Sequence, residues 1–325
     1  MWHFGEEAYQ MGEVRHIVYC GDMGYIPIIG ISMTSVVWNN PGEQLCFHLV
    51  LDGIQPENRA RLERFYALYR NVAGILVHIV PKDGPEMAVF QSIRTLYPVG
   101  TSYRLLLPQL LGGDIQEVLY LDGDVICRQS LAPLFQEALP AEVFAAGVFD
   151  ADREKHQARL HLREYINAGV LRMNLAAWRR EHILERALAY YEQAGELVLP
   201  DQDAINCVCA GHIAVLPGKY NYPAGCRMRI DQWDEAVPAS ACLLHFLGDL
   251  KPWDAVCLDP KRRWWQRWQA ASLWWDMPLW GRAVPCIRER MPKIRQLLDM
   301  EGPEAVREPY YDLLRFLHDS QRERG

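Results

Sequence analysis

Short apolar runs rich in β-branched residues alternate with amphipathic stretches along the first half of the chain, and this alternation most constrains the fold. Three of the runs are "VRHIVYC" (14–20), "LCFHLVL" (45–51) and "GILVHIV" (74–80). Apolar runs of this length, bounded by Gly, Asp, Asn and Pro, are typical of buried strands. Between the second and third runs, residues 57–71 repeat apolar side chains at three-to-four spacing, which predicts a helix covering a sheet.

The pattern continues beyond residue 80 and predicts an α/β fold with a mostly parallel central sheet. Strand-like runs occur at 117–121, 143–149 and 167–175. Residues 176–193, "AAWRREHILERALAYYEQ", predict one helix of about five turns.

Two aspartates, Asp122 and Asp124, flank Gly123 directly after the strand-like run at 117–121. Ligands of open α/β sheets bind beyond the carboxyl ends of strands, where this pair falls. Two carboxylates this close repel each other unless a cation lies between them. Oxygen ligands suit magnesium or manganese, which keep positions open for water or phosphates. The pattern therefore indicates a metal site; one capping and one solvated aspartate is the simpler alternative.

Composition excludes several classes of protein. The 325 residues, 50% of them hydrophobic, suffice for one large domain or two modest ones. A net charge of −7 provides no basic field, so we expect no nucleic-acid partner. The first residues resemble no signal peptide, and no apolar run approaches the roughly 18 residues that span a bilayer, which predicts a cytoplasmic protein without an integral anchor. Nine cysteines, several in apolar runs, indicate reduced core thiols.

Six motifs follow one another in a fixed order. They are "VYCGDMGYIPIIGISMTSVVWN" (18–39), "YLDGDVI" (120–126), "NAGVLRMNLAAW" (167–178), "DQDAIN" (201–206), "KYNY" (219–222) and "HFLGDLKPW" (245–253). Together they resemble the family 8 glycosyltransferases, which are retaining galactosyl- and glucosyltransferases of the Rossmann-like GT-A fold. The resemblance implies a GT-A catalytic domain at 1–253 and a helical, tryptophan-rich extension at 254–325.

For the metal and the diphosphate, the resemblance implies that Asp122, Asp124 and His245 coordinate manganese or magnesium, which holds the diphosphate of a UDP-sugar donor. A metal bridging both phosphates would neutralise the charge that develops on departing UDP. Lys251 and the backbone at Gly248 are implied as a second clamp on the diphosphate, for which lysine supplies a mobile point charge.

For the nucleotide, Asp22 matches the aspartate that accepts the uracil N–H, and Tyr25 matches an aromatic side chain that stacks on the base. The family commonly has Asn where this chain has Gly24, which removes one side-chain contact. The alternative for this stretch is a plain Asp-Gly turn after a strand. Arg104 matches an arginine near the donor sugar and pyrophosphate, with an ordinary surface arginine as the alternative.

For the sugar and the reaction, the resemblance implies that Gly123, Asn167 and Ala168 line the donor and that Asp201 and Gln202 are catalytic. Asp150 matches the family more loosely, and the resemblance implies that it faces donor or acceptor hydroxyls. An amide is a poor nucleophile, so Gln202 favours same-face attack, in which a UDP oxygen takes the acceptor proton, over a covalent intermediate. In this interpretation Gln202 stabilises positive charge on the sugar, and Asp201 orients hydroxyls.

The sequence changes in character after about Pro252, and six of the eleven tryptophans lie between Trp264 and Trp280. Aromatic side chains interleaved with Lys and Arg at 261–280 predict peripheral contact with the inner face of the plasma membrane. Packing in the protein interior is the alternative. The resemblance implies a galactose or glucose donor and a glycan or lipid-linked acceptor of the lipopolysaccharide type.

Three other classes of protein compete with the glycosyltransferase. A haloacid-dehalogenase-like phosphatase would use Asp122 and Asp124 as nucleophile and acid, but its aspartates follow the first strand of the catalytic sheet. A dinucleotide-binding oxidoreductase needs Gly-x-Gly-x-x-Gly, which "CGDMGYIP" (20–27) lacks. A catalytically inactive sugar-nucleotide-binding protein is the third alternative.

Overall fold

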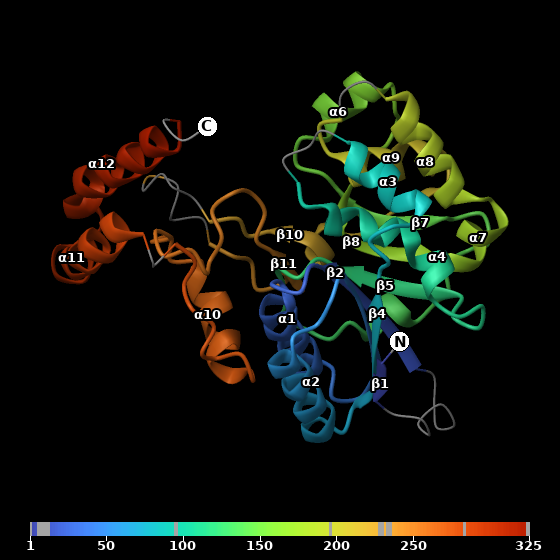
Figure 1. Ribbon diagram of the computed structural model, residues 1–325, viewed down its shortest axis with the longest axis horizontal. Helices are drawn as coiled ribbons and strands as arrows, with labels where there is room; N and C mark the ends of the chain where they lie inside the picture. Colours follow the sequence, from blue (N-terminus) through green and yellow to red (C-terminus); the bar gives the residue numbers. More distant parts are fainter. Residues whose placement is uncertain are drawn as a thin grey trace. The chain divides into compact units, whose positions relative to one another are not determined.

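The computed structural model describes residues 2–4, 14–93, 97–194, 197–226, 231, 236–281 and 284–322 of the chain (Figure 1). The chain forms two compact units. The first, here the sheet unit, comprises Met1–Pro223, Ala239–His245 and Ser272–Trp274. The second, here the helical unit, comprises Ala224–Pro238, Phe246–Ala271 and Trp275–Gly325. The predicted division at residue 253 stays a prediction.

An eight-stranded sheet of order β1-β4-β3-β2-β5-β8-β7-β9 is the centre of the sheet unit. The strands are β1 Trp2–Phe4, β2 Val14–Gly21, β3 Gln44–Leu51, β4 Val72–Ile79, β5 Glu117–Leu121, β7 Ala145–Phe149, β8 Ile166–Asn174 and β9 Ile213–Val215. Neighbours among β4, β3, β2 and β5 pair in parallel, whereas β8 is antiparallel to both β5 and β7. The predicted α/β fold with a mostly parallel sheet is confirmed.

Helices connect these strands and cover the sheet. Helices α1 and α2 follow β2 and β3, while η2, α8 and α9 contribute to a large apolar core with residues of β2, β3, β5 and β8. The helices of the sheet unit are α1 Ile26–Asn39, α2 Pro56–Leu68, α3 Pro85–Ser92, η2 Val99–Leu106, α4 Leu107–Leu110, α5 Ala132–Phe135, α6 Arg153–Leu160, α7 Leu175–Arg180, α8 Ile183–Gln193, α9 Pro200–Val208 and η3 Gly218–Asn221.

The prediction of a single helix over residues 176–193 is wrong, because the stretch is divided between α7 and α8. His182, just before α8, has a left-handed backbone with φ of 53°. A residue in that conformation cannot continue a right-handed helix. The apolar periodicity runs on through the break and therefore conceals it.

A second, three-stranded sheet of order β10-β11-β6 is formed by β6 Val125–Cys127, β10 Tyr222–Pro223 and β11 Leu243–His245. Strands β11 and β6 pair antiparallel, with His245 opposite Val125. This pairing joins the motif after β5 to a segment more than 100 residues later in the chain. It is the feature of the fold that positions the site.

The helical unit contains α10 Arg262–Ala271, α11 Pro285–Glu301 and α12 Pro303–Arg322. Trp253 and Trp265 are fully buried there, with ring centroids 4.6 Å apart. Tyr310 of α12 packs into a separate small apolar core with residues of α11. Within the described part of the chain, none of the helices has the length and apolar character needed to cross a membrane. None of the nine cysteines, all in described segments, forms a disulfide.

The tryptophans of the tail have different environments. Trp274, in the sheet unit, is 0% exposed, and its indole Nε1 donates to Asn58 Oδ1 at 2.9 Å. Its ring lies so close to Gly30 of α1 that a Cβ there would be 2.2 Å from ring carbons. The adjacent Trp275 is 68% exposed. Interior packing therefore accounts for Trp274 and not for its neighbour.

We expect Trp274→Ala to lower the free energy of unfolding by about 3–5 kcal/mol, because it empties a buried indole site and leaves Asn58 without its partner. Trp275→Ala, one residue away, should change it by less than about 0.5 kcal/mol. Urea unfolding followed by circular dichroism measures both. Equal losses in the two variants would contradict the assignment of Trp274 to the core.

Candidate active site

Aspartates follow three neighbouring parallel strands at the point where each strand ends. Asp22 follows β2, Asp122 follows β5, and Asp52, which the sequence interpretation missed, follows β3. Asp52 Oδ1 accepts the backbone N–H of Met23 at 2.7 Å and so fixes the loop after β2. Parallel strands end at a common edge, and in α/β folds that edge is where ligands bind.

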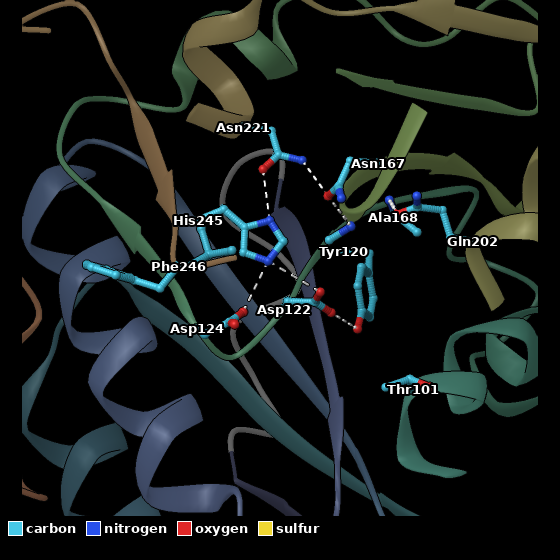
Figure 2. Close-up of polar contacts among 12 residues, drawn as sticks. Thr101, Tyr120, Asp122, Asp124, Asn167, Ala168, Gln202, Asn221, His245 and Phe246 are labelled. Atoms are coloured by element: carbon cyan, nitrogen blue, oxygen red, sulfur yellow. Dashed lines mark hydrogen bonds and ion pairs between the residues drawn. The ribbon is translucent and has the colours of Figure 1, made fainter. Parts of the chain in front are cut away.

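The pairing of β6 with β11 brings His245 to the two predicted metal-binding aspartates (Figure 2). His245 Nε2 lies 3.2 Å from Asp124 Oδ1 and 3.6 Å from Asp122 Oδ2. One ligand atom from each of the three side chains lies within 4.8 Å of the others. Asp124 and His245 are buried, at 5% and 3% exposure. The structure therefore brings the three predicted ligands together.

The two oxygens of Asp122 have different partners. Oδ1 accepts the Tyr120 hydroxyl at 2.6 Å and Arg104 Nη2 at 2.9 Å. Oδ2 is the oxygen on the side of His245. The first oxygen is thus neutralised from within the protein, and the second is oriented toward the imidazole.

A chain of three hydrogen bonds orients the His245 ring, and Figure 2 shows its links from Asn167 to Asn221 and from Asn221 to His245. The carboxylate Oδ2 of Asp150 accepts Asn167 Nδ2 at 3.0 Å, and Asn167 Oδ1 accepts Asn221 Nδ2 at 2.8 Å. The remaining amide oxygen, Asn221 Oδ1, faces His245 Nδ1 at 3.0 Å. Because a carboxylate only accepts, both amides are oriented and Nδ1–H is the donor. The ring therefore presents its other nitrogen, Nε2, to the two aspartates.

This donor set fits a divalent transition metal. Two carboxylates that converge on one point repel each other, and a divalent cation bound between them and the imidazole would offset that repulsion. Carboxylates suit magnesium and manganese, whereas an imidazole ligand favours a transition metal over magnesium. The ring N–H held by an amide oxygen is the usual support for a metal-binding histidine. Manganese satisfies both requirements.

Glycine at position 169 allows this convergence. Gly169 is in β8, and its carbonyl accepts the Asp122 backbone N–H at 2.8 Å. A Cβ at this position would lie 2.1 Å from His245 Cε1 and 2.7 Å from Asp122 Oδ2. Gly123 is constrained in a similar way, because its Cβ would lie 2.6 Å from Tyr25 Cε1. The sequence contained Gly169 within "NAGVLRMN", but only the folded structure shows what it faces.

Arg104 is buried beneath the site. It is 3% exposed, so the alternative of a surface arginine is wrong. Besides Asp122, its guanidinium contacts Asp201 Oδ2 at 3.1 Å and donates to the Ala168 carbonyl at 2.5 Å. Burial by itself would lower the pKa of Arg104, but the carboxylates of Asp122 and Asp201 raise it by more, so the guanidinium stays cationic.

Gln202 and Asp201 lie at the start of α9 and are both 7% exposed. Gln202 Oε1 accepts the Ala168 N–H at 2.9 Å, and its Nε2 donates to Asp150 Oδ2 at 3.1 Å. Asp150 Oδ2 thus accepts hydrogen bonds from both Asn167 and Gln202. Burial raises the pKa of Asp201, while Arg104 opposes the shift. The predicted sugar-site residues therefore form one connected polar network.

The predicted nucleotide-binding residues Asp22 and Tyr25 lie in the loop between β2 and α1. Asp22 Oδ1 accepts the Tyr25 backbone N–H at 2.9 Å. The carboxylate therefore also stabilises a turn after β2, as the alternative of a plain Asp-Gly turn predicts. Burial and the carboxylates of Asp124, Asp122 and Asp22 hold the pKa of the Tyr25 phenol well above its ordinary value. A Cβ at Gly24 would lie 3.1 Å from Asp22 Oδ1. Contact of these residues with a base stays a prediction.

Two predicted diphosphate-binding residues belong to the helical unit. Gly248 has φ of 89°, a left-handed conformation that favours glycine. Lys251 Nζ donates to the Phe246 carbonyl at 2.9 Å, and its backbone N–H donates to Asp254 Oδ2 at 2.6 Å. Their role in a diphosphate clamp stays a prediction.

Comparison with known proteins identifies the class. The pattern of glycosyl transferase family 8 matches residues 16–257, well over half of the chain. The chain therefore belongs to glycosyl transferase family 8 and is a retaining hexosyltransferase. This confirms the resemblance drawn from the six motifs, and it excludes the phosphatase and the oxidoreductase.

Individual relatives and a solved structure agree with the family. The chain is 26% identical to lipopolysaccharide 1,2-glucosyltransferase of Escherichia coli K12, over 85% of this chain and 83% of that one. It is 24% identical to lipopolysaccharide 1,3-galactosyltransferase of Salmonella typhimurium, over 80% and 79%. The galactosyltransferase LgtC, solved with donor and acceptor sugar analogues, superimposes with a TM-score of 0.65 at 23% identity, over 79% and 96%. That likeness shows the GT-A fold.

We expect Gly169→Ala to weaken manganese binding at least about tenfold, because the new methyl group displaces the His245 ring from Asp122. Isothermal titration with MnCl₂ measures the affinity. Gly42→Ala is the control, since a Cβ there meets nothing within 4 Å. Unchanged affinity in Gly169→Ala would mean that His245 is not a ligand in this position.

Proposed function

We propose that this enzyme transfers glucose or galactose from the UDP-sugar to a glycan of the lipopolysaccharide type, with manganese assisting the departure of UDP. The convergence of Asp122, Asp124 and His245 beyond the sheet edge carries the proposal. The relatives named for lipopolysaccharide glucosyl and galactosyl transfer support the choice of sugar and acceptor. The two sugars differ by one epimeric hydroxyl, and both would use the same metal contacts.

Asp122, Asp124 and His245 would hold the metal, and the bound metal would act as a Lewis acid that neutralises charge on the leaving diphosphate. Arg104 pairs with Oδ1 of Asp122, so Oδ2 of the same carboxylate would be the oxygen that binds the metal. The hydrogen bonds that link Asp150, Asn167, Asn221 and His245 keep Nε2 of His245 facing the same point. Lys251 and the backbone at Gly248 are the further residues that we propose for binding the diphosphate.

The donor sugar would lie against Asn167, Ala168, Asp201 and Gln202. Gln202 cannot act as a strong nucleophile because it is an amide, and its Oε1 already accepts the Ala168 N–H. Asp201 is buried and paired with Arg104, which lowers the nucleophilicity of its carboxylate. Same-face attack is therefore favoured, with a UDP oxygen taking the acceptor proton, Gln202 stabilising positive charge and Asp201 orienting hydroxyls. A sugar adduct trapped on a side chain would overturn this mechanism.

We expect one UDP-hexose with MnCl₂ to raise the melting temperature, because a ligand that binds only the native state stabilises it. Chelation or Asp124→Ala should abolish the shift, and Asp124→Ala should lower kcat/KM at least about 100-fold. The control Asp83→Ala removes an exposed carboxylate in another loop and should change neither. Differential scanning fluorimetry and UDP release measure the two effects.

The same experiment separates an enzyme from an inactive binding protein. Slow, metal-dependent hydrolysis of the UDP-sugar without acceptor is expected of the enzyme. Stabilisation without any UDP release, with or without a lipopolysaccharide acceptor, would instead indicate the inactive sugar-nucleotide-binding alternative.

We also propose peripheral contact with an anionic lipid surface through residues 261–280, where a lipid-linked acceptor would be presented. Trp275 and Trp280 are 68% and 43% exposed, and Arg263 and Arg267 of α10 are exposed as well. Exposed indoles and arginines suit the headgroup region, where rings and basic groups meet anionic lipids. Trp265 of the same segment is buried and cannot take part.

Vesicles of phosphatidylcholine with anionic phosphatidylglycerol should sediment the protein, and pure phosphatidylcholine vesicles should sediment much less of it. Trp275→Ser should reduce the bound fraction several-fold, because an indole at the interface is replaced by a small polar group. Trp38→Ser is the matched control, since Trp38 is 60% exposed but lies on α1. An equal loss of binding in both variants would contradict the assignment to 261–280.

A further inference from the structure

A second group of metal-ligating side chains lies on three adjacent parallel strands, away from the active site. His16 is on β2, Cys46 and His48 are on β3, and His78 is on β4. His16 is paired in register with Cys46. Along β2, His16 precedes Asp22 by six residues, or about 20 Å of extended chain. The group is therefore distinct from the site at the sheet edge.

These polar residues occupy core positions. Cys46, His48 and His78 are 2%, 0% and 5% exposed, and His16 is half-buried. The neighbouring positions two residues further along the same strands, Val18 and Val50, belong to the main apolar core. Strands covered on both faces are normally apolar, and buried polar groups are costly unless they are partnered. Three imidazoles and a thiol gathered there call for a specific interaction.

The other three side chains converge on the two ring nitrogens of His48. His48 Nδ1 lies 3.1 Å from His78 Nε2, while His48 Nε2 lies 2.9 Å from His16 Nδ1 and 3.7 Å from Cys46 Sγ. When Nδ1–H of His48 donates to His78, its Nε2 presents a single lone pair toward two other ligand atoms.

We propose that His16, Cys46 and His48 form a zinc site, with water in the fourth position. Tetrahedral zinc, with bonds of about 2.0–2.1 Å to nitrogen and about 2.3 Å to sulfur, separates N and S ligands by about 3.6 Å and two N ligands by about 3.4 Å. The distance of 3.7 Å from His48 Nε2 to Cys46 Sγ matches this geometry. The distance of 2.9 Å from His48 Nε2 to His16 Nδ1 would have to increase by about 0.5 Å. A thiolate selects zinc over manganese.

Binding is balanced by loss of one proton. The Cys46 thiol releases its proton to solvent and coordinates as thiolate. His16, which is half-buried, moves its ring proton from Nδ1 to Nε2 and coordinates through Nδ1. His78 acts as a positioning residue, because its Nε2 accepts Nδ1–H of His48 and fixes the tautomer. The bound ion would tie β2 to β3 and stabilise the parallel sheet.

Cobalt substitution tests the proposal, because thiolate coordination produces a near-ultraviolet charge-transfer band that the aspartate and histidine ligands of the active site cannot give. The full-length protein, stripped with chelator, should develop this band as Co²⁺ is added up to two equivalents, which is enough to fill both proposed metal sites, and ZnCl₂ should remove it. Asp124→Ala should leave the band intact. His78→Gln should retain the band but weaken zinc affinity about 10- to 100-fold.

Cys46→Ser should abolish the band, whereas Cys209→Ser, which replaces another buried thiol, should preserve it. Should Cys46→Ser fail to fold, His16→Gln provides the second test, since this half-buried ligand can be replaced with little loss of packing and should weaken cobalt binding at least tenfold. A wild-type protein without the band, or a band that survives Cys46→Ser or is unaffected by His16→Gln, would overturn the proposal.

Discussion

The antiparallel pairing of β6 with β11 is the interaction on which the site depends. It places His245 opposite Val125, one residue beyond Asp124, although the two segments are far apart in sequence. Loss of this short sheet would leave two aspartates without their imidazole. The eight-stranded sheet supplies a rigid edge for the aspartates, and the smaller sheet completes the ligand set.

Charge is balanced residue by residue around that pairing. Arg104 is buried but stays cationic because it contacts both Asp122 and Asp201. Removing Arg104 would leave the carboxylates of Asp122 and Asp201 without a positive partner in a site of low exposure. Unpaired buried charges destabilise a protein by more than an exposed ion pair stabilises it. The contact of Arg104 with Asp122 also gives the two carboxylate oxygens different roles. Oδ1 is held within the protein, and Oδ2 faces His245 and could bind a metal. Arg104 therefore acts on both the metal and the sugar parts of the site.

Sequence patterns predicted the α/β class, the parallel strands and the aspartate pair, because strand periodicity and strand-end carboxylates are local signals. The identity of His245 as a partner came only from the ordered motifs, since antiparallel pairing over such a separation has no local signature. Asn221 and Gly169 were hidden within quoted motifs for the same reason. The break at His182 was missed because backbone handedness leaves no trace in apolar spacing.

The hydrogen-bond chain through Asn167 and Asn221 has a single polarity, fixed at one end by the acceptor-only carboxylate of Asp150. Each asparagine donates a hydrogen bond through Nδ2 and accepts one through Oδ1, and for this reason every hydrogen bond in the chain points the same way. Leucine at either position would keep the branched shape of the side chain but could neither donate nor accept, so the hydrogen bonds that orient the His245 ring would be interrupted. Chemical asymmetry, more than packing, thus determines which nitrogen of the imidazole faces the aspartates.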